Sequence, residues 1–128
     1  MQQDAERRPS QIRFLYATKA TVPIETDKIL FLDRLIDDAR QGDVDVQLDL
    51  FLTGVSRDGV GQAKGLPEHT TADRIRESDL ESALGEVSRR QGTVSYVCGP
   101  PAMTDAFVEF VASREGMDSA RVLCEKWW

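Results

Sequence analysis

The chain has 128 residues, the size of one domain, and its 41% hydrophobic and 30% charged residues are usual for a globular protein. Its formal net charge of −6 argues against nucleic acid or an anionic membrane surface as a partner, because both attract basic proteins. No apolar run approaches the ~20 residues of a membrane span, and residues 1–11 form a polar tail without a secretory signal. Two cysteines are too few for a disulfide framework, which favours an intracellular location, in the cytoplasm or the mitochondrial matrix.

The first half of the chain predicts a strand, a helix and a second strand. Residues 12–18 ("IRFLYAT") are rich in strand-forming residues. A helix is predicted from Asp27, which would cap its start, to Gln41, with Gly42 at its end. Its apolar stripe consists of Leu32, Leu35, Ile36 and Ala39. Apolar and polar residues alternate over residues 46–53 ("VQLDLFLT"), which predicts a strand with one buried face.

The second half begins with a long polar stretch, residues 54–77, which we interpret as a functional or mobile loop. A helix is predicted to start at Ser78, where Glu81 would complete a capping box, and to end at Gly92. The remaining predicted elements are a strand at 94–98, a helix that begins in "GPPAM" with Met103, Ala106, Phe107, Phe110 and Val111 on its buried face, and a short strand at 121–125.

Strands that alternate with amphipathic helices predict an α/β fold, a parallel sheet with flanking helices, over residues 12–128. In such sheets ligands bind beyond the carboxyl ends of the strands. The segments expected at that edge are Thr18–Lys19, Gly54–Arg57, Cys98–Pro101 and the end of the chain.

The segment "VCGPPAM" carries the clearest chemical signal. A predicted strand ends at Cys98, and Gly99 has no side chain to keep a ligand from the backbone. The following helix would present free N–H groups and the positive end of its dipole. The turn therefore suits a phosphate, ribose or nicotinamide group of a nucleotide, and the alternative is a plain strand-to-helix turn.

Several segments resemble the NAD(P)-binding domain of the ferredoxin–NADP⁺ reductase superfamily. "VCGPPAMTDAF" resembles the family's Cys-Gly-Pro-Pro-x-Met segment, and "CEKWW" resembles the C-terminus of some of its members. "IRFLYATKATVPIETDKILFLDRL", "DLFLTGVSRD" and "ADRIRESDLESAL" are similar to further family segments, so that the resemblance covers roughly residues 12–128. It implies a Rossmann-like domain that binds NAD or NADP and exchanges hydride with a flavin, FAD or FMN, on another domain.

The resemblance also implies roles for individual residues. Cys98 would lie near the nicotinamide ring, with Gly99 and Pro100 shaping its surroundings. Other residues implied at the cofactor are Pro101 and Met103 in the same segment, Thr18 and Lys19 at the adenosine ribose, and Ser56 and Arg57 at a 2′-phosphate. Independently of the resemblance, Glu125 is expected to tune proton delivery because of its place near the end of the chain.

Two tryptophans, Trp127 and Trp128, end the chain. The resemblance implies that one of them stacks on the flavin ring or occupies the place of the nicotinamide. The alternative is that both cover the end of the core.

Some family features are absent from this sequence. It has no Gly-Gly-x-Gly-x-x-Pro segment with its preceding first strand, and no Arg-x-Tyr-Ser flavin motif. We therefore expect an incomplete domain that binds NAD(P) weakly, FAD on an absent domain, a flavin-binding domain or chain as partner, and self-association. Ala17 and Lys19 replace the family's serine and arginine, which leaves NADH against NADPH open. The alternative function is a non-enzymatic module that acts through protein contacts.

Three further patterns point to no separate site. "GVGQAKG" (59–65) does not link a strand directly to a helix, so we interpret it as flexible loop and not as a dinucleotide fingerprint. His69 is the single histidine and is expected to be a solvated loop residue without metal. Cys98 and Cys124 would end strands that could be neighbours, but their spacing does not favour a metal or redox pair.

Overall fold

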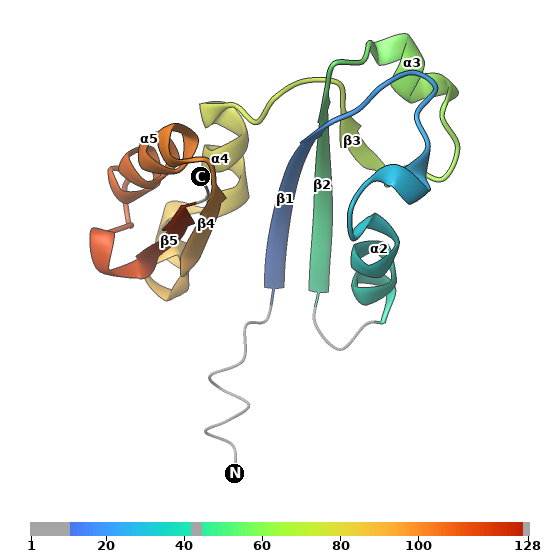
Figure 1. Ribbon diagram of the computed structural model, residues 1–128. Helices are drawn as coiled ribbons and strands as arrows, with labels where there is room; N and C mark the ends of the chain where they lie inside the picture. The colour runs from blue at the N-terminus through green and yellow to red at the C-terminus, as the bar shows by residue number, and fades with distance from the viewer. Residues whose placement is uncertain (1–10, 42–44, 127–128) are drawn as a thin grey trace. The chain divides into compact units, whose positions relative to one another are not determined.

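The computed structural model describes residues 11–41 and 45–126, which form two compact units divided after Ile75 (Figure 1). The first unit contains the elements β1 (Gln11–Lys19), the 3-10 helix η1 (Thr26–Lys28), α2 (Leu32–Arg40), β2 (Asp45–Thr53), α3 (Arg57–Gln62) and β3 (His69–Thr71). The second contains α4 (Glu77–Leu84), the 3-10 helix η2 (Val87–Gly92), β4 (Ser95–Gly99), α5 (Pro101–Ala112), the 3-10 helix η3 (Ser119–Arg121) and β5 (Val122–Lys126).

The first unit is built on a parallel sheet with the strand order β1-β2-β3. β1 pairs with β2 along its whole length, from Gln11 opposite Asp45 to Lys19 opposite Thr53. Because side chains alternate along a strand, one face of β2 presents three leucines to the core. These are Leu48, Leu50 and Leu52, which pack with Ile29 and Leu32. The helix α2 covers this face (Figure 1). Both strands predicted in this half are confirmed by β1 and β2.

The helix predicted from Asp27 to Gln41 begins later than expected. Asp27 lies in η1, and α2 starts at Leu32. Between them Phe31 takes a left-handed backbone conformation with φ of 63°, which no α-helix can contain. Tyr16 secures this turn, since its hydroxyl donates to the Leu30 carbonyl at 2.9 Å. The end expected at Gly42 lies outside the described residues.

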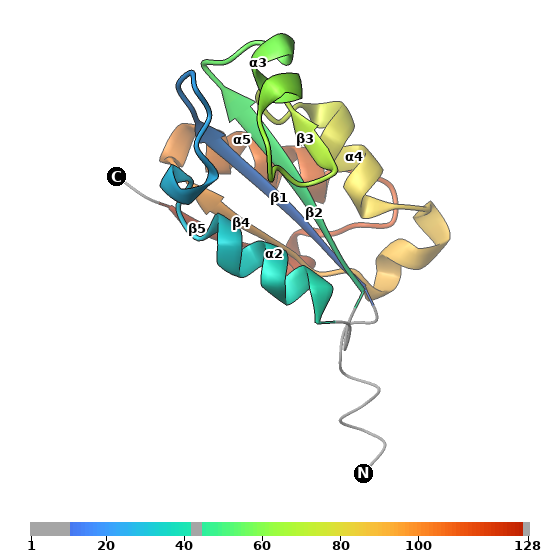
Figure 2. The same cartoon turned by 90° about the vertical axis from the view of Figure 1, so that its right-hand side faces the viewer.

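The long loop expected over residues 54–77 contains two short elements. Ser56 caps α3, and Figures 1 and 2 both show α3 following the carboxyl end of β2. β3 then pairs in parallel with β2, with His69 opposite Asp49. The Thr70 hydroxyl donates to the Pro67 carbonyl at 2.7 Å and holds the approach to this strand. His69 is therefore an exposed strand residue and not the loop residue expected from the sequence.

The second unit has its own parallel pair, β4 with β5, with α5 packed against it. Its core is formed by Leu84, Val111 and Val122 from α4, α5 and β5. The strands predicted at 94–98 and 121–125 are confirmed, as are the prolines at the start of α5. The buried face of α5 differs from the expected one. Ala106 is exposed, and Thr104 is fully buried because its hydroxyl has a backbone partner.

The helix predicted to run from Ser78 to Gly92 is shorter. α4 runs from Glu77 to Leu84, Gly85 stops it with a φ of 73°, and η2 then runs to Gly92. The expected capping box between Ser78 and Glu81 is wrong. The Asp79 carboxylate accepts from the backbone N–H of Arg76 at 2.8 Å instead.

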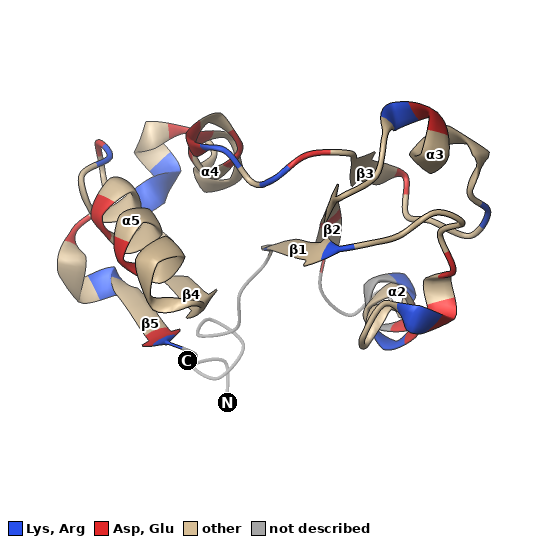
Figure 3. Cartoon of the chain, turned by 45° about the horizontal axis from the view of Figure 1, so that its top comes forward, with Lys and Arg blue, Asp and Glu red and all other residues tan. Residues whose placement is uncertain are grey.

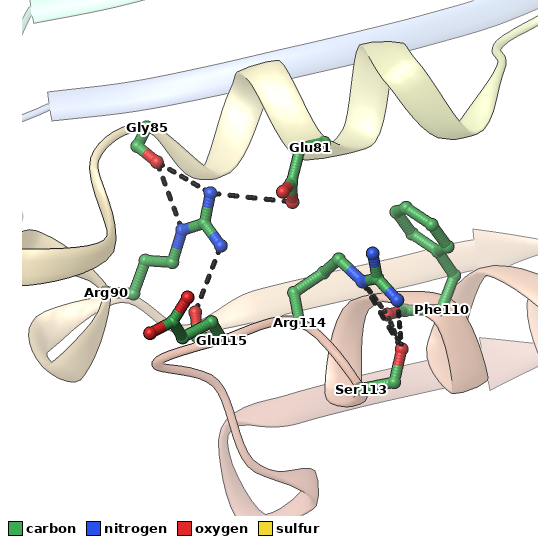
Figure 4. Close-up of polar contacts among 7 residues, drawn as sticks. All are labelled: Glu81, Gly85, Arg90, Phe110, Ser113, Arg114 and Glu115. Carbon is green, nitrogen blue, oxygen red and sulfur yellow. Dashed lines mark hydrogen bonds and ion pairs between the residues drawn. The ribbon is translucent and has the colours of Figure 1, made fainter.

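Arg90 links three segments of the second unit from a buried position (Figure 4). Its Nε and Nη2 donate to the Gly85 carbonyl at 3.0 and 2.8 Å, and Nη1 donates to the Glu115 carbonyl at 3.0 Å. The Glu81 carboxylate lies 3.5 Å from Nη2. The guanidinium thereby ties the end of α4 to the turn after α5 through three hydrogen bonds to their carbonyls.

Arg90→Met should lower the free energy of unfolding by about 2–4 kcal/mol, because it removes the three hydrogen bonds and the contact with Glu81 that the buried guanidinium makes. The matched control is Arg89→Met, since Arg89 is the exposed neighbour on the same 3-10 helix. Urea unfolding followed by circular dichroism measures both variants. Equal midpoints for the two would contradict the role assigned to Arg90.

Among the described residues each unit has its own parallel sheet, with three strands in the first unit and two in the second. The parallel pairing and the flanking helices are confirmed, and together they give an α/β architecture of the Rossmann-like kind. Gln11, placed in the polar tail by sequence, is the first residue of β1, and residues 1–10 lie outside the described part. Within the described residues, no helix is long and apolar enough to cross a bilayer.

Candidate functional site

The carboxyl ends of β1 and β2 meet at one edge of the three-stranded sheet. The backbone N–H of Ala20 donates to the Thr53 carbonyl at 2.9 Å, which continues the pairing one residue beyond the strands. Gly54 then turns the chain with φ of 83°. A Cβ on Gly54 would lie 2.9 Å from the Ala20 carbonyl oxygen and 3.5 Å from Lys19 Cγ. The glycine is therefore required by the backbone, and it brings Lys19 beside the turn.

Two cations stand at this edge without an acidic partner. Lys19 ends β1, and Arg57 is the first residue of α3 after Ser56. The Ser56 hydroxyl accepts from the Gly59 backbone N–H at 3.1 Å, so its oxygen already serves as the helix cap. Both cations are exposed, and neither forms an ion pair among the described residues. In Figure 3 a basic residue is followed by an acidic one at the start of α3, which is Asp58.

Thr18 is tied to the core and not to the open edge. It lies two residues after Tyr16, on the face of β1 that packs against the leucines of β2. The pKa of Tyr16 is raised from 10.0, mainly by burial, and a hydrogen bond with the Thr18 side chain opposes this in part.

In the second unit, the turn between β4 and α5 is closed by its own side chains. Gly99 is buried, and a Cβ there would collide with Met103 Cε. The Thr104 hydroxyl donates to the Gly99 carbonyl at 3.0 Å, and the Thr104 N–H donates to the Pro100 carbonyl at 2.9 Å. The absence of a side chain at Gly99 leaves room for Met103, whereas the sequence had suggested that it leaves room for a ligand.

The start of α5 is poorly suited to hold a phosphate. Pro100 and Pro101 have no N–H groups, so the first turn offers fewer donors than an ordinary helix start. Figure 3 shows acidic but no basic residues along α5, and Lys126 is paired with Asp105 at 2.7 Å. The pKa of Lys126 is raised by this hydrogen bond with Asp105. An uncharged ring fits this environment better than an anion.

One face of the β4–β5 pair carries a cysteine, a tyrosine and a carboxylate. Cys98 lies directly opposite Glu125 in the register, and Tyr96 and Leu123 precede them by two residues on the same face. The Tyr96 hydroxyl donates to Glu125 Oε2 at 2.8 Å. This hydrogen bond raises the pKa of Tyr96. The opposite face holds the buried Val122, which packs with α5, so the Tyr96 face is the one that α5 leaves open.

The structure thus groups the predicted site residues by unit. Lys19, Ser56 and Arg57 follow β1 and β2, whereas Cys98, Met103 and Glu125 gather around β4 and β5. Sequence reasoning missed Tyr96, although its position two residues before Cys98 on a strand was a usable signal. It also missed the buried Thr104, which no sequence pattern marks.

Three predictions about other residues have different outcomes. Cys98 and Cys124 are on neighbouring strands, as the sequence suggested. Each is a free thiol, and the two lie on opposite faces of the strand pair. No group of three or more metal-ligating side chains occurs in the described part of the chain. Trp127 and Trp128 lie outside the described residues, so their stacking on a flavin stays a prediction.

The chain is similar to two curated proteins of the same name. It is 28% identical over 122 residues to Oxidoreductase NAD-binding domain-containing protein 1 of Bos taurus, which covers 91% of this chain and 33% of that protein. It is 28% identical over 120 residues to the Danio rerio protein of that name, which covers 94% of this chain and 40% of that protein. The chain therefore spans between 33% and 40% of the length of these relatives. No protein-family profile and no solved structure matches it.

Two glycine substitutions should have unequal costs. Gly54→Ala should lower the free energy of unfolding by about 1–3 kcal/mol, because it forces a left-handed alanine against the backbone oxygen of Ala20. Gly99→Ala should cost less than about 1 kcal/mol, because the colliding atom is the terminal methyl of Met103, which can rotate away. Urea unfolding of both variants measures the difference. The reverse order would contradict the described packing at one of the two turns.

Proposed function

We propose that the chain is the nicotinamide-dinucleotide-binding part of a flavin-dependent NAD(P)H oxidoreductase. The observation that carries this proposal is the similarity, along more than nine tenths of the chain, to two proteins named for an oxidoreductase NAD-binding domain. The α/β units with parallel strands support it, because such sheets bind nucleotides beyond the carboxyl ends of their strands. The flavin, FAD or FMN, would be held by a separate domain or chain and would exchange hydride with the nicotinamide.

We assign a role to the sheet edge of each unit separately. Lys19 and Arg57 form no ion pair with another described residue, which suits them to the adenosine end and to a 2′-phosphate when the cofactor is NADP. Cys98, with Gly99 and the two prolines, would lie at the nicotinamide ring. The few donors and acidic surroundings of this turn support a ring without negative charge there over a phosphate. Glu125 would assist proton delivery at this end.

The chemistry at the site follows from how these groups position the cofactor. The bound nicotinamide supplies the hydride. The backbone around Gly99 and the Cys98 side chain would fix the ring plane. The Glu125 carboxylate, in register with Cys98, accepts hydrogen bonds and holds negative charge beside the ring. Met103 covers the backbone of Gly99 and would exclude water from that side.

The chain should bind NADH and NADPH weakly, with dissociation constants in the high micromolar range or above, because its sequence has no Gly-Gly-x-Gly-x-x-Pro segment whose backbone N–H groups would bind the pyrophosphate. Calorimetric titration with each cofactor, with and without added flavin, measures this. Arg57→Ala should weaken NADPH binding more than NADH binding if Arg57 contacts the 2′-phosphate. The control is Arg89→Ala, an exposed arginine of the second unit.

Two results of these titrations would oppose the proposal. Absence of any binding up to millimolar cofactor would overturn it for this chain. Equal losses for both cofactors in Arg57→Ala would remove Arg57 from the 2′-phosphate site only.

A non-enzymatic module that acts through protein contacts is the second candidate. The observation that favours it is that large apolar side chains, among them Tyr96 and Leu123, are exposed on the open face of β4 and β5. Light scattering at increasing concentration, together with the cofactor titrations, separates the two functions. Association without cofactor binding supports the module.

A further inference from the structure

The hydrogen bond between Tyr96 and Glu125 fixes one side of a carboxylate. Tyr96 comes from β4 and Glu125 from β5, and their side chains share the open face of the pair. The Tyr96 hydroxyl donates to Oε2 at 2.8 Å, and no described side chain donates to Oε1. The carboxylate is thus held by one oxygen, and its residue lies opposite Cys98 in the register of the two strands. An unrestrained glutamate on an exposed strand end would instead sample several rotamers.

A carboxylate held in this way discriminates between ring substituents by charge and hydrogen bonding. An ionised carboxylate accepts hydrogen bonds only. A carboxamide has an NH₂ group and can donate to it, whereas a second carboxylate can only repel it. The two groups have nearly the same size, so the difference between them is electrostatic and not steric.

We propose that Tyr96 is a positioning residue that holds Glu125 so that the site selects the carboxamide of nicotinamide over the carboxylate of nicotinic acid. This inference rests on the proposed function, because it takes Cys98 and Glu125 to lie at the ring. It adds a substrate discrimination and a residue that neither the sequence motifs nor the relatives' names assign. The charged and titratable groups near the Tyr96 hydroxyl are Glu125, Cys98 and Cys124, and Glu125 alone bonds to it.

The hydrogen bond itself is tested without any ligand. The chain has two tyrosines, so Tyr16→Phe leaves Tyr96 as the single phenol whose ionisation the ultraviolet absorbance reports. Because the bond to Glu125 raises the pKa of Tyr96, adding Glu125→Gln in this background should lower that pKa. The sign follows from protonation, since only the neutral phenol donates to the carboxylate. An unchanged titration would overturn the inference, whatever the cofactor binding.

The discrimination is tested with NAD⁺ and its nicotinic acid analogue, which differ only in the ring substituent. The chain should bind NAD⁺ about tenfold more tightly than the analogue, the value of one charge-assisted hydrogen bond. Tyr96→Phe should reduce this preference by about threefold or more, and Glu125→Gln should abolish it, because a glutamine can also donate to a carboxylate. The matched control is Ser113→Ala, which removes a hydroxyl that donates to the Phe110 carbonyl at 2.6 Å on α5 (Figure 4).

The outcomes separate the inference from the proposed function. Failure of the unaltered chain to bind NAD⁺ would overturn the function and the inference together. Binding of NAD⁺ with the same preference in Tyr96→Phe as in Ser113→Ala would overturn the inference and leave the function standing. A fall of both affinities by equal factors in Tyr96→Phe would show a structural role and would also overturn it.

Discussion

Parallel strand pairing is the constraint on which the rest of this structure depends. In each unit the paired strands run the same way, so the residues that follow them lie at one edge. Lys19 and Gly54 become neighbours for this reason, and so do Cys98 and Glu125. The leucines of β2 and Val122 of β5 fix the register, because a slip of one residue would turn them away from their cores. The chemistry of both edges follows from this packing.

The strands were predictable because alternation is a strong and local signal. Residues 46–53 alternate as a strand with one buried face must, and β2 occupies nearly the same range. The helix boundaries were less predictable, since backbone dihedrals decided them. No sequence pattern around Phe31 predicts its left-handed backbone conformation. In the second unit, α4 is stopped by Gly85 and not by the expected Gly92. Arg90 was likewise an unremarkable residue in sequence, although the second unit buries it.

The position of Cys98 and Gly99 at the end of a strand was predictable from the sequence, but the contacts of these residues were not. The carboxyl-end rule led to Cys98 and Gly99 without knowledge of what touches them. It could not foresee that Met103 fills the space above Gly99, since that depends on where α5 packs. Tyr96 was missed because it precedes the Cys-Gly-Pro-Pro-x-Met segment. Its side chain lies on the same face as that of Cys98 because side chains alternate along a strand. The alternation of side chains along the strand, followed to residues before the motif, predicts that Tyr96 shares a face with Cys98.

The two prolines between β4 and α5 have a consequence for the entropy of the site. Each ring fixes one backbone dihedral in the unfolded chain as well as in the folded one. Less freedom is therefore lost when the segment beside Cys98 becomes ordered, and less remains to be lost when a ligand binds there. A site with few hydrogen-bond donors gains affinity mainly through such preorganisation. Pro100 and Pro101 have no N–H groups that could bind a phosphate. Their fixed backbone dihedrals define the shape of this segment before any ligand could bind.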